Sequence, residues 1–196
     1  MKKMIKLPLF LAIICVVSTG LLAAVNAWTA PIIEQHQVEE QNKGYLQMLG
    51  LENLNGKAIE TTDVDETLAS KGLTKKTVVT NTSDDSVFGI VYDGSVAGYG
   101  GKSSPIVFQV GFVGGYYSGF NYLSHGETPS VGQAKVLDTL NAYLTGTDAA
   151  LTDNVSASDD FAVDAAFLTM TAGATVTKSK LVPAMKAAAA DYLASI

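Results

Sequence analysis

Hydrophobic and polar positions follow three different patterns along the 196-residue chain. Residues 7–27 form an uncharged run that is long enough for a helix to cross a bilayer core. From residue 30 to residue 50, apolar side chains recur at roughly helical spacing, and Gly50 ends the helix that this spacing predicts. Residues 51–75 are polar and rich in turn residues, with one short helix predicted near residues 64–71.

From residue 76 the pattern becomes that of a sheet, with many β-branched and aromatic residues. Strands are predicted over residues 77–82, 86–92, 106–113 and 116–123. Turn residues stand between them, namely Asp84-Asp85, Asp93-Gly94 and Gly114-Gly115. The aromatic residues of the last strand favour a half-buried hairpin over a surface for ligand stacking.

Two helices complete the pattern, one over residues 133–144 that ends at Gly146 and a final one that ends near Leu193. Pro183 limits where the final helix begins, because an interior proline removes a hydrogen bond. Ser179 as the N-cap leaves Pro183 in the first turn, whereas Thr177 as the cap would kink the helix, so Ser179 is predicted. This order of elements predicts an α+β fold, with helices packed against an antiparallel sheet.

Charges beside the first apolar run predict how it lies in a membrane. Lys2, Lys3 and Lys6 precede it, and Glu34, Glu39 and Glu40 follow it. Lysines on the first side predict a cytoplasmic N-terminus, a single-pass anchor in the cell membrane and an extracytoplasmic C-terminal part. A cleaved signal peptide is the alternative, with Val25-Asn26-Ala27 as the cleavage site. We predict an anchor over residues 1–30, a helical connector over 31–50 and a folded domain over 51–196.

Composition excludes several classes of function. The chain has 19 acidic residues, 13 lysines and no arginine, which disfavours binding to nucleic-acid phosphates. Its single cysteine, Cys15, allows no internal disulfide. With two histidines and one cysteine, the sequence predicts no Cys/His metal site.

Two loops carry candidate chemistry. Residues 171–177 read Thr-Ala-Gly-Ala-Thr-Val-Thr before the final helix, with Lys178 and Lys180 after them. Small residues let a ligand approach the backbone, and a helix N-terminus suits a phosphate. Residues 125–132 read His-Gly-Glu-Thr-Pro-Ser-Val-Gly between a strand and a helix. They fit a plain turn, a ligand-clamping loop or a catalytic pair of His125 and Glu127, although no nucleophile accompanies that pair.

Taken in order, these motifs resemble those of RnfG, the FMN-binding component of the Rnf electron-transport complex. More distantly, they resemble those of NqrC, a component of the sodium-pumping NADH:quinone reductase. Residues 98–101 are similar to the family's GYGG, and Val110-Gly111 follows as in the family. Residues 125–132 resemble H-x-E-T-P-G-L-G, and residues 173–177 resemble G-A-T-x-T. The resemblance covers nearly the whole chain.

The resemblance implies FMN bound covalently through a phosphoester to Thr175, attached by a separate flavin transferase that uses FAD. The further cofactor-binding residues that it implies are Gly173, Ala174, Thr177, Lys178, Glu127, Thr128, Pro129, Ser130, Val131 and Gly132. No catalytic residues are implied, because FMN supplies the redox chemistry. This chain departs from the family at Ala172 (usually Ser or Thr), at Thr169 (usually Asp) and at Ser130-Val131 (usually Gly-Leu).

The function implied is that of a redox subunit, not catalytic alone, in an Rnf-type ferredoxin:NAD⁺ oxidoreductase coupled to sodium or proton translocation. Its partners would be the other membrane subunits of that complex. One alternative is a free-standing, anchored, extracytoplasmic flavoprotein. The other is a surface scaffold domain of the same fold without FMN.

Overall fold

The computed structural model describes residues 15, 18–21, 42–147 and 154–196, and the chain divides into two compact units, residues 1–43 and 44–196. In the first unit, Cys15 and residues 18–21 are helical. The predicted anchor and most of the predicted connector lie outside the described residues. Within the described part of the chain, no helix combines the length and the apolar character needed to span a membrane.

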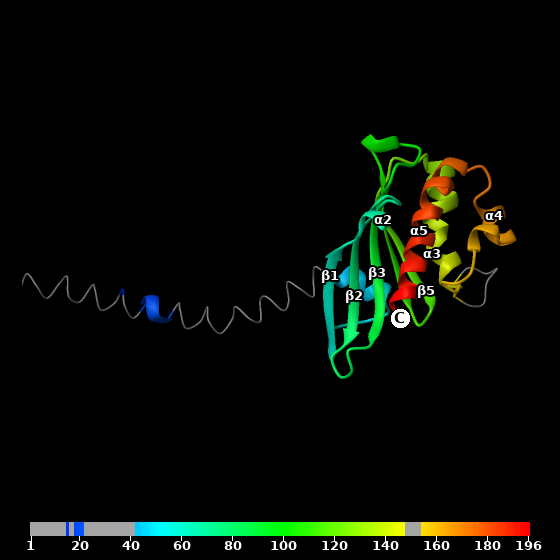
Figure 1. Cartoon of the computed structure of the whole chain (residues 1–196). Coiled ribbons are helices and arrows are strands. Elements are labelled where there is room, and N and C mark those ends of the chain that lie inside the picture. Colours follow the sequence, from blue (N-terminus) through cyan, green and yellow to red (C-terminus); the bar gives the residue numbers. More distant parts are fainter. Residues whose placement is uncertain (1–14, 16–17, 22–41, 148–153) are drawn as a thin grey trace, which may run out of the picture. The chain divides into compact units, whose positions relative to one another are not determined.

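The second unit contains a five-stranded antiparallel sheet in which each strand pairs with its neighbours in the sequence (Figure 1). Its strands are β1 (Lys57–Asp63), β2 (Leu73–Asn81), β3 (Val87–Val96), β4 (Ile106–Val113) and β5 (Tyr116–Ser124). The antiparallel sheet and the four strands predicted from the sequence are therefore confirmed.

Two predictions about the sheet were wrong. Strand β1 was not predicted, because it is an edge strand whose side chains are mostly exposed and polar, without a hydrophobic alternation. The pair Asp93-Gly94 is not a turn but lies inside β3, where Asp93 pairs with Gln109 and Gly94 with Phe108. A Cβ at Gly94 would overlap the ring of Phe108, so this glycine leaves room for a core aromatic side chain.

Besides the helical segment 42–48, the second unit has the helices α2 (Glu66–Ala69), η1 (Gly101–Ser103), η2 (Pro129–Leu137), α3 (Asp138–Leu144), η3 (Phe161–Val163), α4 (Ala165–Met170) and α5 (Thr175–Ser195). Of these, α3 and α5 pack against one face of the sheet (Figure 1). The short helix predicted near residues 64–71 is confirmed as α2. The helix predicted over residues 133–144 begins earlier, at Pro129, and its first part, η2, is π-helical. The amide of Gln133 accordingly donates to the carbonyl of Thr128, five residues before it, at 3.1 Å.

The start of the last helix differs from the prediction. Ala174 is the N-cap of α5, so Ser179 lies in the second turn and Pro183 in the helix interior. Pro183 has no amide to donate to the carbonyl of Ser179. The buried stripe of α5 nevertheless begins at Thr177 and continues through Leu181, so packing of the first turns outweighs the lost hydrogen bond.

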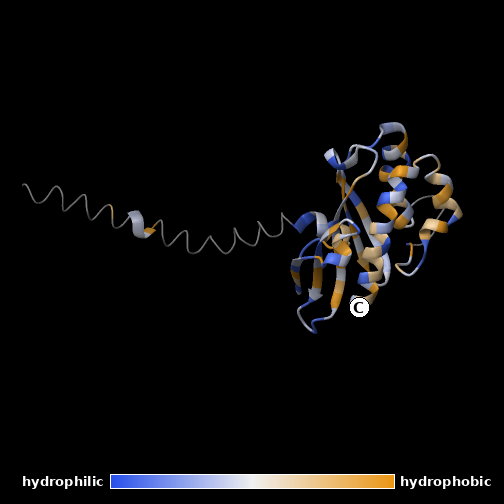
Figure 2. Ribbon diagram, turned by 45° about the horizontal axis from the view of Figure 1, so that its top comes forward, coloured by the Kyte–Doolittle hydropathy of each residue, from blue (hydrophilic) through white to orange (hydrophobic). Residues whose placement is uncertain are grey.

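The two faces of the sheet are buried against different elements. Ile90, Tyr92 and Phe112 belong to the main core beneath α3 and α5, and Figure 2 shows hydrophobic residues along these helices. Val79 and Val91 on the other face contact Met48 and Leu49, at the end of the helical segment 42–48. Gly50 has a φ of 70°, in the left-handed region that ends many helices, as the sequence predicted.

A polar contact also fastens segment 42–48 to the sheet. The hydroxyl of Tyr45 donates to Oδ2 of Asp93 at 2.7 Å, and Nε2 of Gln109 donates to Oδ1 of Asp93 at 2.8 Å. Burial, followed by the hydrogen bond to Asp93, raises the pKa of Tyr45 to about 12. The end of the predicted connector is thus packed into the folded unit.

Candidate functional site

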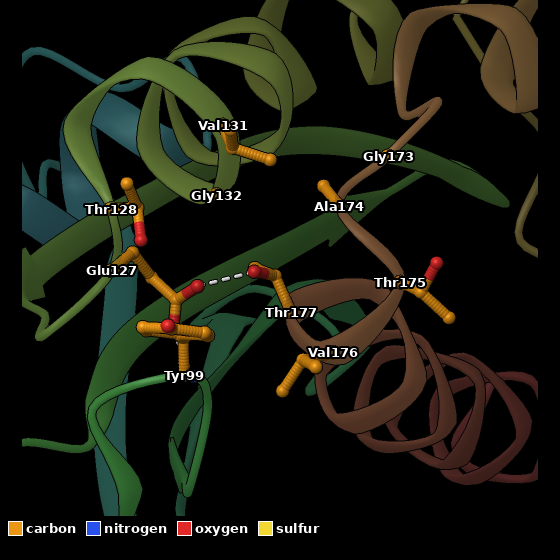
Figure 3. Close-up of a pocket in the computed structure, with 10 residues that line it drawn as sticks. All are labelled: Tyr99, Glu127, Thr128, Val131, Gly132, Gly173, Ala174, Thr175, Val176 and Thr177. Atoms are coloured by element: carbon orange, nitrogen blue, oxygen red, sulfur yellow. Dashed lines mark hydrogen bonds between the residues drawn. The ribbon is translucent and has the colours of Figure 1, made fainter.

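Three loops enclose a pocket of about 290 Å³ at one end of the sheet. One loop follows β3, one follows β5 and one precedes α5, so the three loops are far apart in the sequence. Its lining residues, drawn in Figure 3, are Tyr99, Glu127, Thr128, Val131, Gly132, Gly173, Ala174, Thr175, Val176 and Thr177.

Most of the site residues predicted from the sequence lie around this pocket. The predicted residues among the lining are Glu127, Thr128, Val131, Gly132, Gly173, Ala174, Thr175 and Thr177. Pro129 and Ser130 begin η2 but do not line the pocket, and neither does Lys178 in the first turn of α5. Tyr99 and Val176 line it without having been predicted as site residues. Tyr99 lies in the GYGG-like motif and could have been found there, whereas nothing in the sequence distinguishes Val176.

Glu127 ties together the loop after β3, the loop after β5 and the first turn of α5. Its side chain is buried, with 5% of the residue exposed, and Oε2 accepts a hydrogen bond from the hydroxyl of Thr177, itself only 2% exposed. The other oxygen, Oε1, accepts from the amide of Tyr99 at 2.6 Å. A buried carboxylate needs such donors, since an unpaired one is strongly destabilising. Glu127 therefore fixes the loop after β3 and the first turn of α5 against its own loop.

Two glycines make room for this carboxylate. A Cβ at Gly98 would overlap Oε1 of Glu127, and a Cβ at Gly132 would overlap Oε2. The Cβ at Gly132 would also lie 2.7 Å from the hydroxyl oxygen of Thr177. Steric exclusion around one side chain thus explains one glycine in each motif, Gly98 and Gly132.

The same contacts bear on the catalytic interpretation of His125 and Glu127. The amide of Glu127 donates to Nδ1 of His125 at 3.2 Å, and the imidazole ring packs edge-on against Tyr122, 5.2 Å between ring centroids. Both carboxylate oxygens of Glu127 already accept hydrogen bonds from the protein. This geometry favours a clamping loop over an acid–base pair.

The two candidate hydroxyls of the last motif have opposite environments. Thr175 is the exposed first residue of α5, and in Figure 3 its side chain lies apart from the Glu127–Thr177 pair. The hydroxyl of Thr177 is buried and donates to Glu127. Thr175 is thus the hydroxyl that an external reagent can approach.

Groups that favour an anion lie in the first turn of α5 and beside the loop that precedes it. The first intrahelical bond of α5 runs from the amide of Lys178 to the carbonyl of Ala174 at 3.0 Å, so the three preceding amides have no partner within the helix. These amides form the positive end of the helix dipole. Nζ of Lys135, on η2, donates to the carbonyl of Ala172 at 3.0 Å and adds a full positive charge beside the loop. Sequence reasoning missed Lys135, because only the fold brings η2 next to residues 171–174.

Comparison with protein families agrees with this geometry. The model of the RnfG N-terminal region matches residues 1–48, and the model of the FMN-binding domain matches residues 98–190. The chain is an RnfG-like FMN-binding subunit. A comparison with curated proteins gives no match. Every lining residue of the pocket falls within the matched FMN-binding domain of this RnfG-like chain, so the family match and the pocket coincide. The two matches support an FMN-binding electron-transfer subunit.

The pocket of the RnfG-like chain has the donors and surfaces that FMN requires. Backbone amides of α5 and the ammonium of Lys135 suit the phosphate, while Val131, Val176 and the ring of Tyr99 suit a flat aromatic ring system. The cavity of about 290 Å³ is close to the lower end of the range for small-molecule sites, which begins at about 300 Å³. The residues present therefore fit the cofactor that the family implies.

Proposed function

We propose that this chain is a membrane-anchored redox subunit of an Rnf-type ferredoxin:NAD⁺ oxidoreductase and carries FMN covalently on Thr175. The observation that carries the proposal is the contrast between the two threonines. Thr175 presents an exposed hydroxyl at the first residue of α5, beside the pocket, whereas the hydroxyl of Thr177 is buried on Glu127.

Attachment is a phosphoryl-type transfer from FAD, performed by a separate flavin transferase. The hydroxyl oxygen of Thr175 forms a bond to the flavin-side phosphorus of FAD, and the pyrophosphate P–O bond to that phosphorus breaks. AMP leaves with the bridging oxygen, and the hydroxyl proton passes to a base of the transferase. The product is a phosphodiester between the ribityl chain and Thr175, so the flavin cannot diffuse away outside the cell.

Within the subunit the protein's role is to hold and orient. The cofactor, once bound, supplies one- and two-electron redox chemistry. The amides of the first turn of α5 and Lys135 stabilise the negative phosphate. Glu127 keeps the walls of the pocket in register by joining Tyr99 to Thr177. Gly173, Ala174, Thr128 and Val131 line the remaining surface.

The place of the subunit in a membrane complex is the second part of the proposal. The match of residues 1–48 to the RnfG N-terminal region and the uncharged run at 7–27 support an anchor. The lysines before that run and the acids after it support an extracytoplasmic FMN-binding domain, in the division 1–30, 31–50 and 51–196. Its partners are the other membrane subunits of the complex, and electron transfer is coupled to sodium or proton translocation.

Co-expression with a flavin transferase tests the covalent site. After denaturing electrophoresis, the wild-type band should fluoresce as flavin, and mass analysis should locate FMN on the peptide containing Thr175. Thr175→Ala should abolish the fluorescence, and Thr74→Ala, an exposed threonine of β2 outside the pocket, should leave it unchanged. A dark wild-type band under conditions that flavinylate a positive control would refute covalent attachment. Full fluorescence in Thr175→Ala would refute the assigned residue.

One alternative has a specific observation in its favour. Ala172 and Thr169 replace residues that the family usually has near the acceptor, and both lie exposed beside the loop where a transferase would dock. A scaffold domain that has kept the fold without FMN would show this pattern. It predicts a dark band in the same experiment, so one measurement separates the two functions.

A further inference from the structure

Tyr99 is a large aromatic residue in an unusual position at the mouth of the pocket. It is 69% exposed, yet it lines the pocket and its backbone is firmly held. Its amide donates to the buried Oε1 of Glu127 at 2.6 Å. An aromatic side chain on a rigid loop loses little conformational freedom when a ligand packs against it, and it supplies a large apolar face.

The neighbours of Tyr99 hold the loop without using its ring. A Cβ at Gly98 would overlap Glu127, and a Cβ at Gly100 would lie 2.8 Å from Cα of Gly126 and 2.7 Å from the carbonyl oxygen of Ser104. The glycines therefore let the backbone pack closely on both sides. Tyr99 is left as the side chain that segment 98–101 projects outward.

Tyr99 and Thr175 lie on opposite sides of the pocket, with the Glu127–Thr177 pair between them (Figure 3). A ligand fixed to the hydroxyl of Thr175 and extending across the pocket therefore points toward the side that carries Tyr99. In FMN the group farthest from the phosphate is the flat isoalloxazine ring system. Its shape and polarisable face match those of a phenol ring.

We propose that Tyr99 stacks on the isoalloxazine ring of the bound flavin, an inference that rests on the proposed function. The contact restrains the ring at the end of its flexible tether. It also brings a readily oxidised phenol against the flavin. Light excitation then lets an electron pass from the phenol to the flavin and back, which quenches the flavin's fluorescence without net oxidation. A phenyl ring in the same place packs equally well and does not quench.

The full chain, flavinylated by co-expression, is compared as wild type, Tyr99→Phe, Tyr99→Ala and Tyr116→Ala. Tyr116 is the control because it is 49% exposed and does not line the pocket. Flavin fluorescence after denaturation should be equal in all four, because the bond at Thr175 does not involve Tyr99. In the folded state, emission per flavin should rise severalfold in both Tyr99 variants. Emission anisotropy should fall only in Tyr99→Ala, where the ring is free, and Tyr116→Ala should match the wild type.

Unchanged folded-state emission in both Tyr99 variants, with normal flavin content, would overturn the stacking proposal alone. A dark denatured wild type would overturn the covalent site instead, and the stacking is then tested with free FMN. Wild-type protein added to FMN should quench its emission more strongly than Tyr99→Phe does. Equal quenching by these two proteins, or none by either, would refute the role of Tyr99.

Discussion

The hydroxyl of Thr177 donates a hydrogen bond to Oε2 of Glu127, and this bond joins the first turn of α5 to the loop after β5. Both groups are almost fully buried. This hydrogen bond gives the two threonines at positions 175 and 177 different roles. Thr177 holds the pocket together, and Thr175 is left exposed, as the proposed attachment of the flavin requires.

Replacing Thr177 by valine should weaken the fold without moving the flavin. Loss of the hydroxyl leaves a buried carboxylate with one donor fewer, which should lower the free energy of unfolding by about 1–3 kcal/mol. Urea denaturation measures this loss, and Thr177→Ser, which keeps the hydroxyl, should recover most of it. Peptide mass analysis should still find FMN on Thr175. FMN found on Thr177 in the wild type would contradict the assigned roles.

The glycine at position 132 should be intolerant of a single methyl group. In Gly132→Ala the new Cβ overlaps Glu127 and crowds Thr177, so the hydrogen bond between them must break or the loop must shift. We expect a loss of about 1–3 kcal/mol in unfolding free energy, typical of overpacking, and reduced flavin attachment.

Gly44→Ala is the matched control for this effect, because the nearest atom to its Cβ, Oε1 of Gln109, is 3.8 Å away. It should be neutral or slightly stabilising, since alanine favours a helix more than glycine does. Combining Gly132→Ala with Glu127→Ala should cost less than the sum of the two single losses, because the overlapping side chain is gone. If the two losses in unfolding free energy add in full, the clash with Glu127 is not the cause of the loss in Gly132→Ala.

Sequence patterns predicted those features that depend on local order. The strands at residues 106–113 and 116–123 have strong β-formers bounded by Gly114-Gly115, and the structure has them as β4 and β5. The two loop motifs predicted most of the residues that line the pocket, because both loops lie at the same end of the sheet.

Features that depend on tertiary contacts were not predictable in the same way. Ser179 was favoured as the N-cap because Pro183 is unfavourable inside a helix, yet α5 begins at Thr175, and its buried residues begin with Thr177 and Leu181. Gly94 looked like a turn residue until its role beside the ring of Phe108 was known. Lys135 reaches Ala172 from 37 positions away in the sequence, a separation that no local pattern encodes.

Removal of the Lys135 side-chain charge should slow flavin attachment. Its ammonium donates to the carbonyl of Ala172, in the loop before Thr175, which is the proposed acceptor of the negatively charged phosphate. Lys135→Ala should lower the initial rate of flavinylation by a purified transferase by roughly two- to fivefold, the equivalent of about 0.5–1 kcal/mol for an exposed charge. The effect should shrink at high salt, because screening weakens exposed charges. Lys71→Ala, an exposed lysine after α2, is the control, and equal rates for the two variants would exclude a specific role for Lys135.

Asp191 should make a pH-dependent contribution to the attachment of α5 to the sheet. Its Oδ2 accepts from Nζ of Lys76 at 2.6 Å and from the hydroxyl of Tyr92 at 2.5 Å. Partial burial acts to raise the pKa of Asp191, but the hydrogen bonds from Lys76 and Tyr92 outweigh it and hold that pKa below its usual value. Asp191→Asn should therefore lower the free energy of unfolding at pH 7 by about 2 kcal/mol.

The direction of the pH dependence follows from the lowered pKa. The stabilisation by the ionised carboxylate is fully present above the pKa of the unfolded chain, about 3.9, and is lost as the pH falls through the lower folded-state pKa. Urea denaturation at several pH values measures the difference in unfolding free energy between wild type and Asp191→Asn. This difference should be constant from pH 7 to 5 and should become smaller below about pH 4. Ser195→Ala removes a neutral partner of Lys76, so its smaller effect should not vary with pH. If the difference in unfolding free energy between wild type and Asp191→Asn stays constant down to pH 2, the ionised carboxylate does not stabilise this contact.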